Sequence, residues 1–372
     1  MTSIIYVGMD VHTTNYTLCC YSMEDDRFFA EVQVEPDAKN ILKYLARIEK
    51  QQSRDCRIVC GYEAGCLGYS LYHQLHAHGI DCVILAPTTM MTKPGKRIKT
   101  DRRDARLISK CLAFHTYSPV YIPTEMDDAV KEYIRMRDDA NSALARVKQQ
   151  IIAFCIRHGK IHDGKSYWTN KHLEWLSSLD LGNKILSEVL QEYLIRYYQL
   201  REQMDMYDMR INELAQAEPY RQKVEKLGCF RGIAAHTALS FCVEVGDFRR
   251  FATAQQFASY LGLVPGECSS GDKQQYTGIT KAGNSHLRKL LVETAQVFSR
   301  SATKSGKSVA LKERQAKCDS LTVAYADKAN ARLKKKYFKI AMRSKANIAK
   351  TAVAREMACF IWGMMTDNIS CA

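Results

Sequence analysis

The sequence lacks the features that mark several classes of protein. No stretch approaches the roughly 18 consecutive apolar residues of a membrane span, and the apolar segment 352–365 is interrupted by Arg355 and Glu356. At the start of the chain Asp10 comes before any apolar run of the signal-peptide type could form. We therefore expect a soluble, cytoplasmic protein with no membrane partner.

Several cofactor motifs are also missing. The 14 cysteines are scattered and include no Cys-x-x-Cys pair, which argues against a disulfide scaffold and favours reduced thiols. Neither a Gly-x-x-x-x-Gly-Lys loop nor a Gly-x-Gly-x-x-Gly turn after a strand is present, and the histidines have no cysteines at zinc-finger spacing. ATP, NAD and structural zinc are not supported.

A surplus of positive charge is the most informative property of the composition. The 372 residues include 54 Lys or Arg against 40 Asp or Glu, a net charge of +14. Such a surplus favours a polyanionic partner, nucleic acid before membrane. The length favours two or three domains.

The first part of the chain alternates strand-like and helix-like segments. Apolar or aromatic runs predict strands, and apolar residues at helical spacing predict helices between the later ones. The predicted strands are 4–7, 16–21, 28–34, 57–62 and 83–85, and the predicted helices are 41–48 and 71–78. This order predicts an α/β sheet covered by helices.

From about Met126 the pattern changes to long helices, with a heptad series in the middle of the chain. Its core positions are Leu186, Leu190, Tyr193, Tyr197, Leu200, Met204, Tyr207, Ile211 and Leu214, and a shorter series is Ala140, Leu144, Val147, Ile151 and Phe154. These spacings indicate a coiled coil. Three arrangements are consistent with the spacing. The two series could pair within one chain as an antiparallel hairpin, pair across chains in a dimer, or form a bundle core with no partner chain.

A third region begins near Leu227. It contains predicted helices at 237–245 and 254–261, a Gly- and Ser-containing loop at 265–283, and a helix from Asn284 onward. Its end carries a basic run with no acid between Lys328 and Lys350, and this run includes Lys334, Lys335 and Lys336. Such a run is either a solvated face or a surface that binds phosphates. A solvated face normally contains acids among its basic residues, so their absence here favours phosphate binding.

Four acids are candidates for one site, and the first two of them converge if their strands are neighbours. Asp10 follows the first strand, Glu63 follows the strand 57–62, and Asp101 and Asp104 share one face of a predicted helix. Four such carboxylates suit a pair of Mg²⁺ ions, which clamp a phosphodiester. Singly, each acid has a plainer interpretation: a turn residue for Asp10, a loop acid for Glu63 and a helix N-cap for Asp101.

Basic residues crowd the last two of these acids, which suits a site where metal and nucleic-acid phosphate meet. They are Lys93, Lys96, Arg97, Lys99, Arg102, Arg103 and Arg106. We take Lys99, Arg102 and Arg103 as candidate contacts to nucleic acid.

The order of strands and acids resembles the ribonuclease H-like fold in its RuvC-like form, and the whole chain resembles a narrower family. The motifs are Gly8-Met9-Asp10, Tyr62-Glu63-Ala64, Thr100-Asp101 through Asp104-Ala105, Tyr260-Leu261-Gly262-Leu263-Val264-Pro265, Ser269-Ser270-Gly271, Gly278-Ile279-Thr280-Lys281-Ala282-Gly283-Asn284 and Leu287-Arg288. In this order they are similar to the DEDD-plus-serine transposases of bacterial insertion sequences, the bridge-RNA-guided recombinases that also include pilin-gene invertases.

The resemblance implies a role for a serine that the residues alone do not support. A Ser-Ser-Gly loop is usually a turn, and no His or Lys stands beside it as a base. The resemblance places the DNA-attacking nucleophile at Ser270, with Ser269 as the competing choice, and implies a covalent phosphoserine link to DNA. Lys281 and Arg288, with His286, follow as candidate phosphate contacts or as ordinary surface charge.

One departure from the family lies at residues 231–234. Arg231-Gly232-Ile233-Ala234 stands where members tend to carry Pro-Gly-Ile-Gly, so the proline and the second glycine of the hairpin are missing and the resemblance does not carry over backbone contact to DNA there.

We expect three regions: a RuvC-like DEDD domain at 1–120, a helical coiled-coil region at 121–225, and a mainly helical transposase domain at 226–372. The resemblance implies a Mg²⁺-dependent DNA transposase that acts on donor and target DNA, is directed by a non-coding guide RNA, and works as a homodimer or homotetramer. The rival functions are a RuvC-like junction nuclease, which would not need Ser270, and a non-catalytic protein that bridges nucleic acids, which would not need the four acids.

Overall fold

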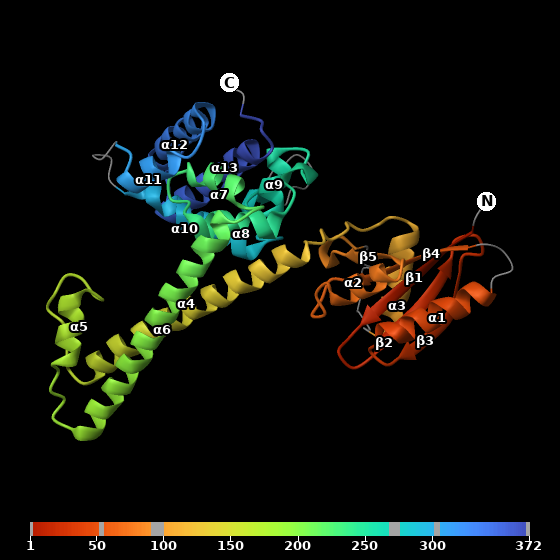
Figure 1. The fold of residues 1–372 in the computed structure, drawn as a ribbon, viewed down its shortest axis with the longest axis horizontal. Helices are drawn as coiled ribbons and strands as arrows, with labels where there is room; N and C mark the ends of the chain where they lie inside the picture. Colours follow the sequence, from red (N-terminus) through yellow and green to blue (C-terminus); the bar gives the residue numbers. More distant parts are fainter. Residues whose placement is uncertain (1–2, 52–55, 91–99, 268–275, 301–305, 370–372) are drawn as a thin grey trace. The chain divides into compact units, whose positions relative to one another are not determined.

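The computed structural model describes residues 3–51, 56–90, 100–267, 276–300 and 306–369 (Figure 1). The chain divides into two compact units, Met1–Ile122 and Pro123–Ala372. In the described part of the chain, no helix combines the length and the apolar character needed to cross a membrane.

The first unit is a five-stranded sheet with helices on both faces. The strand order is β3-β2-β1-β4-β5; β1 pairs antiparallel with β2 and parallel with β4, β2 pairs antiparallel with β3, and β4 pairs parallel with β5. Its elements are β1 (Ser3–Val11), β2 (Tyr16–Ser22), β3 (Arg27–Val34), α1 (Ala38–Gln51), β4 (Cys56–Glu63), α2 (Ser70–Ala77), β5 (Asp81–Leu85), the short 3-10 helix η1 (Pro87–Thr89) and α3 (Asp101–Ala113). The predicted α/β sheet and its hairpin are confirmed.

Alternation along β1 assigns its residues to two cores. Ile5, Val7 and Met9 belong to the cluster that contains the buried residues of α1 and α2, whereas Tyr6 belongs to the cluster that contains Ile108 and Leu112 of α3. Successive side chains of a strand point to opposite faces of the sheet. Residues 6, 8 and 10 therefore face α3.

The second unit is almost entirely helical. Its elements are α4 (Glu125–Arg157), α5 (Asn170–Ser177), α6 (Lys184–Gln216), α7 (Arg221–Gly228), α8 (Ala235–Val245), η2 (Phe248–Arg250), α9 (Ala254–Tyr260), β6 (Pro265–Glu267), β7 (Tyr276–Ile279), α10 (Ser285–Ala295), η3 (Gln296–Ser299), α11 (Val309–Gln315), α12 (Ser320–Ala341) and α13 (Ala346–Met365). One large core joins α7 to α10 with α12 and α13.

The two heptad series lie on α4 and α6, which pack together within the chain (Figure 1). The rings of Tyr133 and Tyr207 are 5.8 Å apart, and those of Phe154 and Tyr193 are 6.0 Å apart. The start of α4 therefore meets the end of α6, so the pair is antiparallel. Of the three alternatives that the sequence leaves open, the structure has the hairpin within one chain; assembly across chains stays a prediction.

The segment 265–283, expected to be a loop, contains a small antiparallel sheet. Strands β6 and β7 pair with Pro265 opposite Ile279 and Glu267 opposite Tyr276. These strands have three and four residues. Segments this short carry too few alternating positions for a sequence pattern to reveal them.

Candidate active site

Asp10 and Glu63 lie at the carboxyl ends of two neighbouring parallel strands. Met9 of β1 pairs with Tyr62 of β4, so the next residue on each strand is one of the two acids. Asp10 lies within β1 and Glu63 is the last residue of β4, whereas the sequence pattern placed both directly after their strands. The two strands are neighbours, which is the condition for their two carboxylates to converge.

The two other acids are in the first turn of α3. Thr100 is the N-cap, and its hydroxyl accepts a hydrogen bond from the backbone N–H of Arg103 at 3.4 Å. Asp101 is therefore the first helical residue, and its alternative interpretation as the cap is wrong. Carboxylates in the first turn are stabilised by the helix dipole. The same turn presents Asp101 and Asp104 toward the end of β1.

Close packing of α3 on β1 brings the acids together. A Cβ atom at Gly8 would lie 2.0 Å from the carbonyl oxygen of Ala105 and 2.4 Å from the backbone nitrogen of Ser109. Only a residue without a side chain allows the helix backbone to approach the strand this closely. Because Asp10 is two residues after Gly8 on the same face, the start of α3 lies beside its carboxylate.

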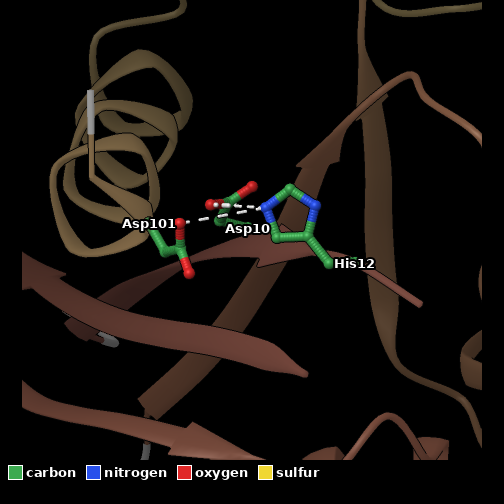
Figure 2. A group of neighbouring side chains, drawn as sticks. All are labelled: Asp10, His12 and Asp101. Atoms are coloured by element: carbon green, nitrogen blue, oxygen red, sulfur yellow. Dashed lines mark ion pairs between the residues drawn. The ribbon is translucent and has the colours of Figure 1, made fainter. Parts of the chain in front are cut away.

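Asp10, His12 and Asp101 form a compact group of potential metal ligands (Figure 2). The Nε2 atom of His12 lies 3.3 Å from Oδ2 of Asp10 and 4.0 Å from Oδ1 of Asp101, and one ligand atom from each residue lies within 4.8 Å of the others. Glu63 and Asp104 are not members of this group. His12 was not among the predicted site residues, although it stands two positions after Asp10, where a strand returns to the same face.

The environment of Asp10 disfavours its negative charge. Burial raises the pKa of this carboxyl, His12 lowers it, and the charges of Asp104 and Asp101 raise it further, for a net upward shift. Its Oδ2 atom is buried and makes no well-formed hydrogen bond; the Nε2 atom of His12, 3.3 Å away, is the potential donor beside it. A buried carboxylate oxygen without a well-formed hydrogen bond, beside a second carboxylate, is what a divalent cation would satisfy. The residues present therefore fit a metal ion.

Two of the neighbouring cations are already paired. Arg102 and Arg106 of α3 lie 3.3 and 2.7 Å from the carboxylate of Glu31 in β3. Arg103 is exposed, and Lys99 lies outside the described residues. The pairing lowers the charge that Arg102 offers to a phosphate, although its side chain remains 79% exposed.

Ser269 and Ser270 lie outside the described residues, between β6 and β7 in the sequence. The turn after β7 is described, and it packs tightly on the end of α9. Gly262 and Gly283 have φ values of +64° and +75°, and a Cβ at either would lie 2.0 to 2.1 Å from a carbonyl oxygen, that of Ala282 or Tyr260. The glycines of these motifs are thus needed for the turn itself.

Of the cations near this turn, Arg288 has a structural role and Lys281 is exposed. One guanidinium nitrogen of Arg288 donates to the carbonyl oxygens of Leu261 at 2.9 Å and Ala282 at 3.2 Å. Lys281 has a φ of 56°, and its backbone N–H donates to the carbonyl of Gly262. Its ammonium is the more accessible of the two for a phosphate.

A buried charged cluster that sequence reasoning missed adjoins the same turn. His286 of α10 lies between two carboxylates, with Nδ1 2.5 Å from Oε1 of Glu244 and Nε2 2.7 Å from Oδ2 of Asp138. Nε2 of His236 is 3.0 Å from the other oxygen of Asp138. These residues come from α4, α8 and α10, and no spacing in the sequence connects them.

Comparison with known proteins identifies the family. Residues 7–156 match the model of a DEDD-type transposase, and residues 225–311 match the model described as Transposase IS116/IS110/IS902 family. The chain is 36% identical over 307 residues to a transposase of Sinorhizobium fredii named y4qE, covering 82% of this chain and 75% of that protein. It is 32% identical over 340 residues to the transposase for insertion sequence element IS1533 of Leptospira borgpetersenii, covering 90% and 95%. The chain belongs to the IS116/IS110/IS902 family of insertion-sequence transposases.

The recognised resemblance is thus confirmed at the level of the family. This membership implies that the transposase acts on DNA by cleavage and rejoining, and the DEDD type suggests the use of a divalent metal. The matched residues 7–156 contain all four acids of the motif, and the matched residues 225–311 contain both candidate serines.

The basic run of the transposase lies on α12 and the start of α13. Lys336 and Arg332 of α12 both form ion pairs with Glu356 of α13, an acid that lies beyond the run in the sequence but beside it in space. Lys335 is exposed and Lys334 is half-buried. The run is therefore less uniformly basic than its sequence indicates.

Proposed function

We propose that this transposase cleaves and rejoins DNA through a covalent phosphoserine intermediate formed by Ser270, with Asp10, Glu63, Asp101 and Asp104 holding Mg²⁺. The observation that carries the proposal is the convergence of Asp10, His12 and Asp101 from β1 and α3, with a buried oxygen of Asp10 that makes no well-formed hydrogen bond. Family membership supplies the substrate, DNA.

The chain's own residues position the ion and the phosphate. Asp10, with its charge disfavoured by burial and by two neighbouring acids, is an avid ligand for a cation. His12 adds a nitrogen ligand to the same group, and Glu63 follows from the adjacent strand. Mg²⁺ bound there would polarise the scissile phosphate and stabilise charge that develops in the transition state.

The serine step balances without an external energy source. The Oγ of Ser270 attacks the scissile phosphorus, an O–P bond forms as the bond to the leaving deoxyribose oxygen breaks, and the serine proton goes to solvent while the leaving oxygen takes one up. The phosphodiester energy stays in the protein–DNA bond. A second strand end then attacks that bond, releases the serine and rejoins the DNA without ATP.

We infer a RuvC-like arrangement for the first unit. The sheet order β3-β2-β1-β4-β5, with acids at the ends of β1 and β4 and on the helix that covers β1, supports it. The division into 1–120, 121–225 and 226–372 belongs to the same proposal. A structured non-coding RNA from the same element would direct the choice of donor and target DNA, and the active form would be a homodimer or homotetramer.

Nucleic-acid contacts are proposed for the cationic side chains singled out in the sequence. They are Lys99, Arg102, Arg103, Lys281, Arg288, Lys334, Lys335 and Lys336. Among the described members, Arg103, Lys281 and Lys335 are exposed, Arg102 is exposed but paired with Glu31, and Arg288 and Lys336 are engaged within the chain.

Trapping the reaction on labelled DNA tests the proposal. After denaturation, label should travel with the wild-type protein and with Ser269→Ala, but not with Ser270→Ala. Adducts from Ser270→Ala and none from Ser269→Ala would move the nucleophile to Ser269. Clean cleavage with no adduct from the wild type would instead identify a junction nuclease that uses water.

The assembly and the guide RNA need separate measurements. Light scattering of the full chain with and without nucleic acid should report a dimer or tetramer; a monomer in both would contradict it. RNA that copurifies with the protein should map to a non-coding segment beside the gene and be required for strand exchange. Full exchange on DNA alone would remove the RNA from the proposal.

A further inference from the structure

His286 is held as a cation between two acids. Its two ring nitrogens lie 2.5 Å from a carboxylate oxygen of Glu244 and 2.7 Å from one of Asp138. Ionised carboxylates only accept hydrogen bonds, so both nitrogens donate and the ring is an imidazolium. Because both ring nitrogens carry a hydrogen and donate it, neither has a free lone pair that could accept a proton. His286 therefore cannot be the base that activates a serine.

Glu244 is the centre of this cluster. Its side chain is 2% exposed, and its second oxygen accepts a hydrogen bond of 2.6 Å from Nδ2 of Asn284. The same acid therefore holds two residues, Asn284 and His286, of the segment that leaves β7 and begins α10. Asn284 is also the N-cap of α10, where its side-chain oxygen accepts from the backbone N–H of Leu287 at 3.0 Å.

The segment held by Glu244 ends the β6–β7 hairpin. Backbone N–H groups of Thr280, Lys281 and Asn284 donate to the carbonyl oxygens of Val264, Gly262 and Tyr260, and so tie the exit of β7 to the approach of β6. Both ends of the connection between β6 and β7 are thereby attached next to α9 and α10, two helices that pack on α13. Any displacement of residues 280–286 would move the end of β7.

The other end of the bridge reaches the long helix α4. Asp138 lies 3.1 Å from Arg137, which also pairs with Asp208 of α6 at 2.8 Å, and His236 of α8 is within 3.0 Å of Asp138. Arg135 lies 3.8 Å from Glu244. The cluster thus joins α4, α6, α8 and α10 through charged groups.

We propose that Glu244 and Asp138, bridged by His286, are positioning residues that hold the β6–β7 hairpin in the geometry needed for DNA strand cleavage. This inference rests on the proposed function, because that function places the nucleophile in the connection between these strands. Apolar residues would pack the same helices at lower desolvation cost. Directional charged hydrogen bonds instead specify one position for the turn.

Two variants test the two ends of the bridge. Glu244→Gln replaces one of the two acceptor oxygens with an NH₂ group, which then faces the donor of either Asn284 or His286, and Asp138→Asn places an NH₂ group against one of the donors at the α4 end. Glu293→Gln is the matched control, because Glu293 is an exposed acid on α10. All are made in the full chain and assayed below the melting temperature of the least stable variant, with rates normalised to the fraction that binds DNA.

Amide hydrogen exchange gives the readout that is independent of chemistry. In Glu244→Gln, the amides of Thr280, Lys281 and Asn284 should exchange at least about tenfold faster than in the wild type, whereas Glu293→Gln should leave them unchanged. Unchanged protection in both Glu244→Gln and Asp138→Asn would overturn the inference.

The kinetic readout separates positioning from folding. With saturating DNA, the first-order rate of strand cleavage should fall about 10- to 100-fold in Glu244→Gln while DNA affinity stays within about twofold, because a displacement near 1 Å costs up to about 10²-fold. A purely structural role would lower the active fraction and leave the normalised rate unchanged, which would overturn the inference. Wild-type cleavage without a protein–DNA adduct would contradict Ser270 as the nucleophile. The amide exchange rates and the cleavage rates of the variants would still decide whether Glu244 and Asp138 are positioning residues.

Discussion

Gly8 of β1 lies so close to Ala105 of α3 that a Cβ atom at Gly8 would be 2.0 Å from the Ala105 carbonyl oxygen. This contact sets the distance between the strand that carries Asp10 and the helix that carries Asp101 and Asp104. Asp10 and Asp101 lie close together because a glycine allows the two backbones to touch. Tight packing and the candidate metal site therefore depend on the same residue.

Gly8→Ala should separate α3 from β1 and destabilise the first unit. Overpacking of this kind costs about 1–3 kcal/mol or more, because the clash is with backbone and not with a movable side chain. Hydrogen exchange of the β1 amides in the full chain measures the loss. Gly65→Ala is the control, since the nearest atom to its new Cβ is at 3.8 Å. Equal protection in the two variants would mean that the helix moves freely.

Asp10→Asn should abolish strand transfer without lowering stability. The pKa of Asp10 is raised, chiefly by burial, so its ionised form costs folding free energy once the pH exceeds the ordinary value near 3.8, and asparagine removes that cost. Nucleic-acid binding should stay largely intact, because it comes mainly from the basic surface. Full activity of Asp10→Asn, or of the wild type in EDTA, would exclude the metal site.

Mg²⁺ should raise the melting temperature of the wild type, and the increase should be absent from Asp10→Asn. An ion at 100 times its dissociation constant stabilises the folded state by about 2.7 kcal/mol. Differential scanning calorimetry of both proteins, with Mg²⁺ and with EDTA, measures the effect. An equal increase in melting temperature in both proteins would mean that the ion binds at another site.

Lys335→Gln should weaken nucleic-acid binding for all sequences alike and reduce the salt slope by about 0.9. Lys336→Gln on the same helix should have the smaller effect, because the Lys336 ammonium is paired with Glu356. Titrations at several salt concentrations compare the two variants, with Lys334→Gln as a third. If neither the affinity nor the salt slope changed in any of the three variants, the basic run would be a solvated face that does not bind nucleic acid.

The second unit should be most stable at mildly acidic pH. Burial alone lowers the pKa of His286, but hydrogen bonds to Asp138 and Glu244 outweigh it and raise the pKa to about 9, so its stabilisation is complete below about 6.5 and is lost as the pH rises through 9. The charged or titratable groups around it are Asp138, Glu244, Arg135, Arg137, Asp208 and His236. Hydrogen bonds from His286 and its neighbours hold the pKa values of Asp138 and Glu244 below their usual range despite burial, so stability also falls when these acids are protonated.

Tryptophan fluorescence during urea unfolding measures this dependence in the full chain, because Trp168, Trp175 and Trp362 all lie in the second unit. His286→Asn should flatten the alkaline limb between pH 6.5 and 9. A wild-type curve that is flat over that interval would contradict the assignment of a cationic His286.

The sequence by itself determined the features that depend on local patterns. Alternation and helical spacing were sufficient for the strands of the first unit and for the long helices. They also placed Asp10 and Glu63, as candidate ligands, at the ends of two strands. The heptads of α4 and α6 likewise follow from residue order alone, because one face of a helix repeats every three or four positions.

Only the tertiary structure decided which distant residues meet. It added His12 to the candidate metal ligands, paired Arg102 with Glu31, placed Glu356 beside the basic run, and gathered Asp138, Glu244 and His286 from three helices. No local pattern encodes such contacts, because they depend on how helices and strands pack across long separations in the chain. The net charge around a segment and the role of a histidine are set by residues that are close in space but far apart along the chain.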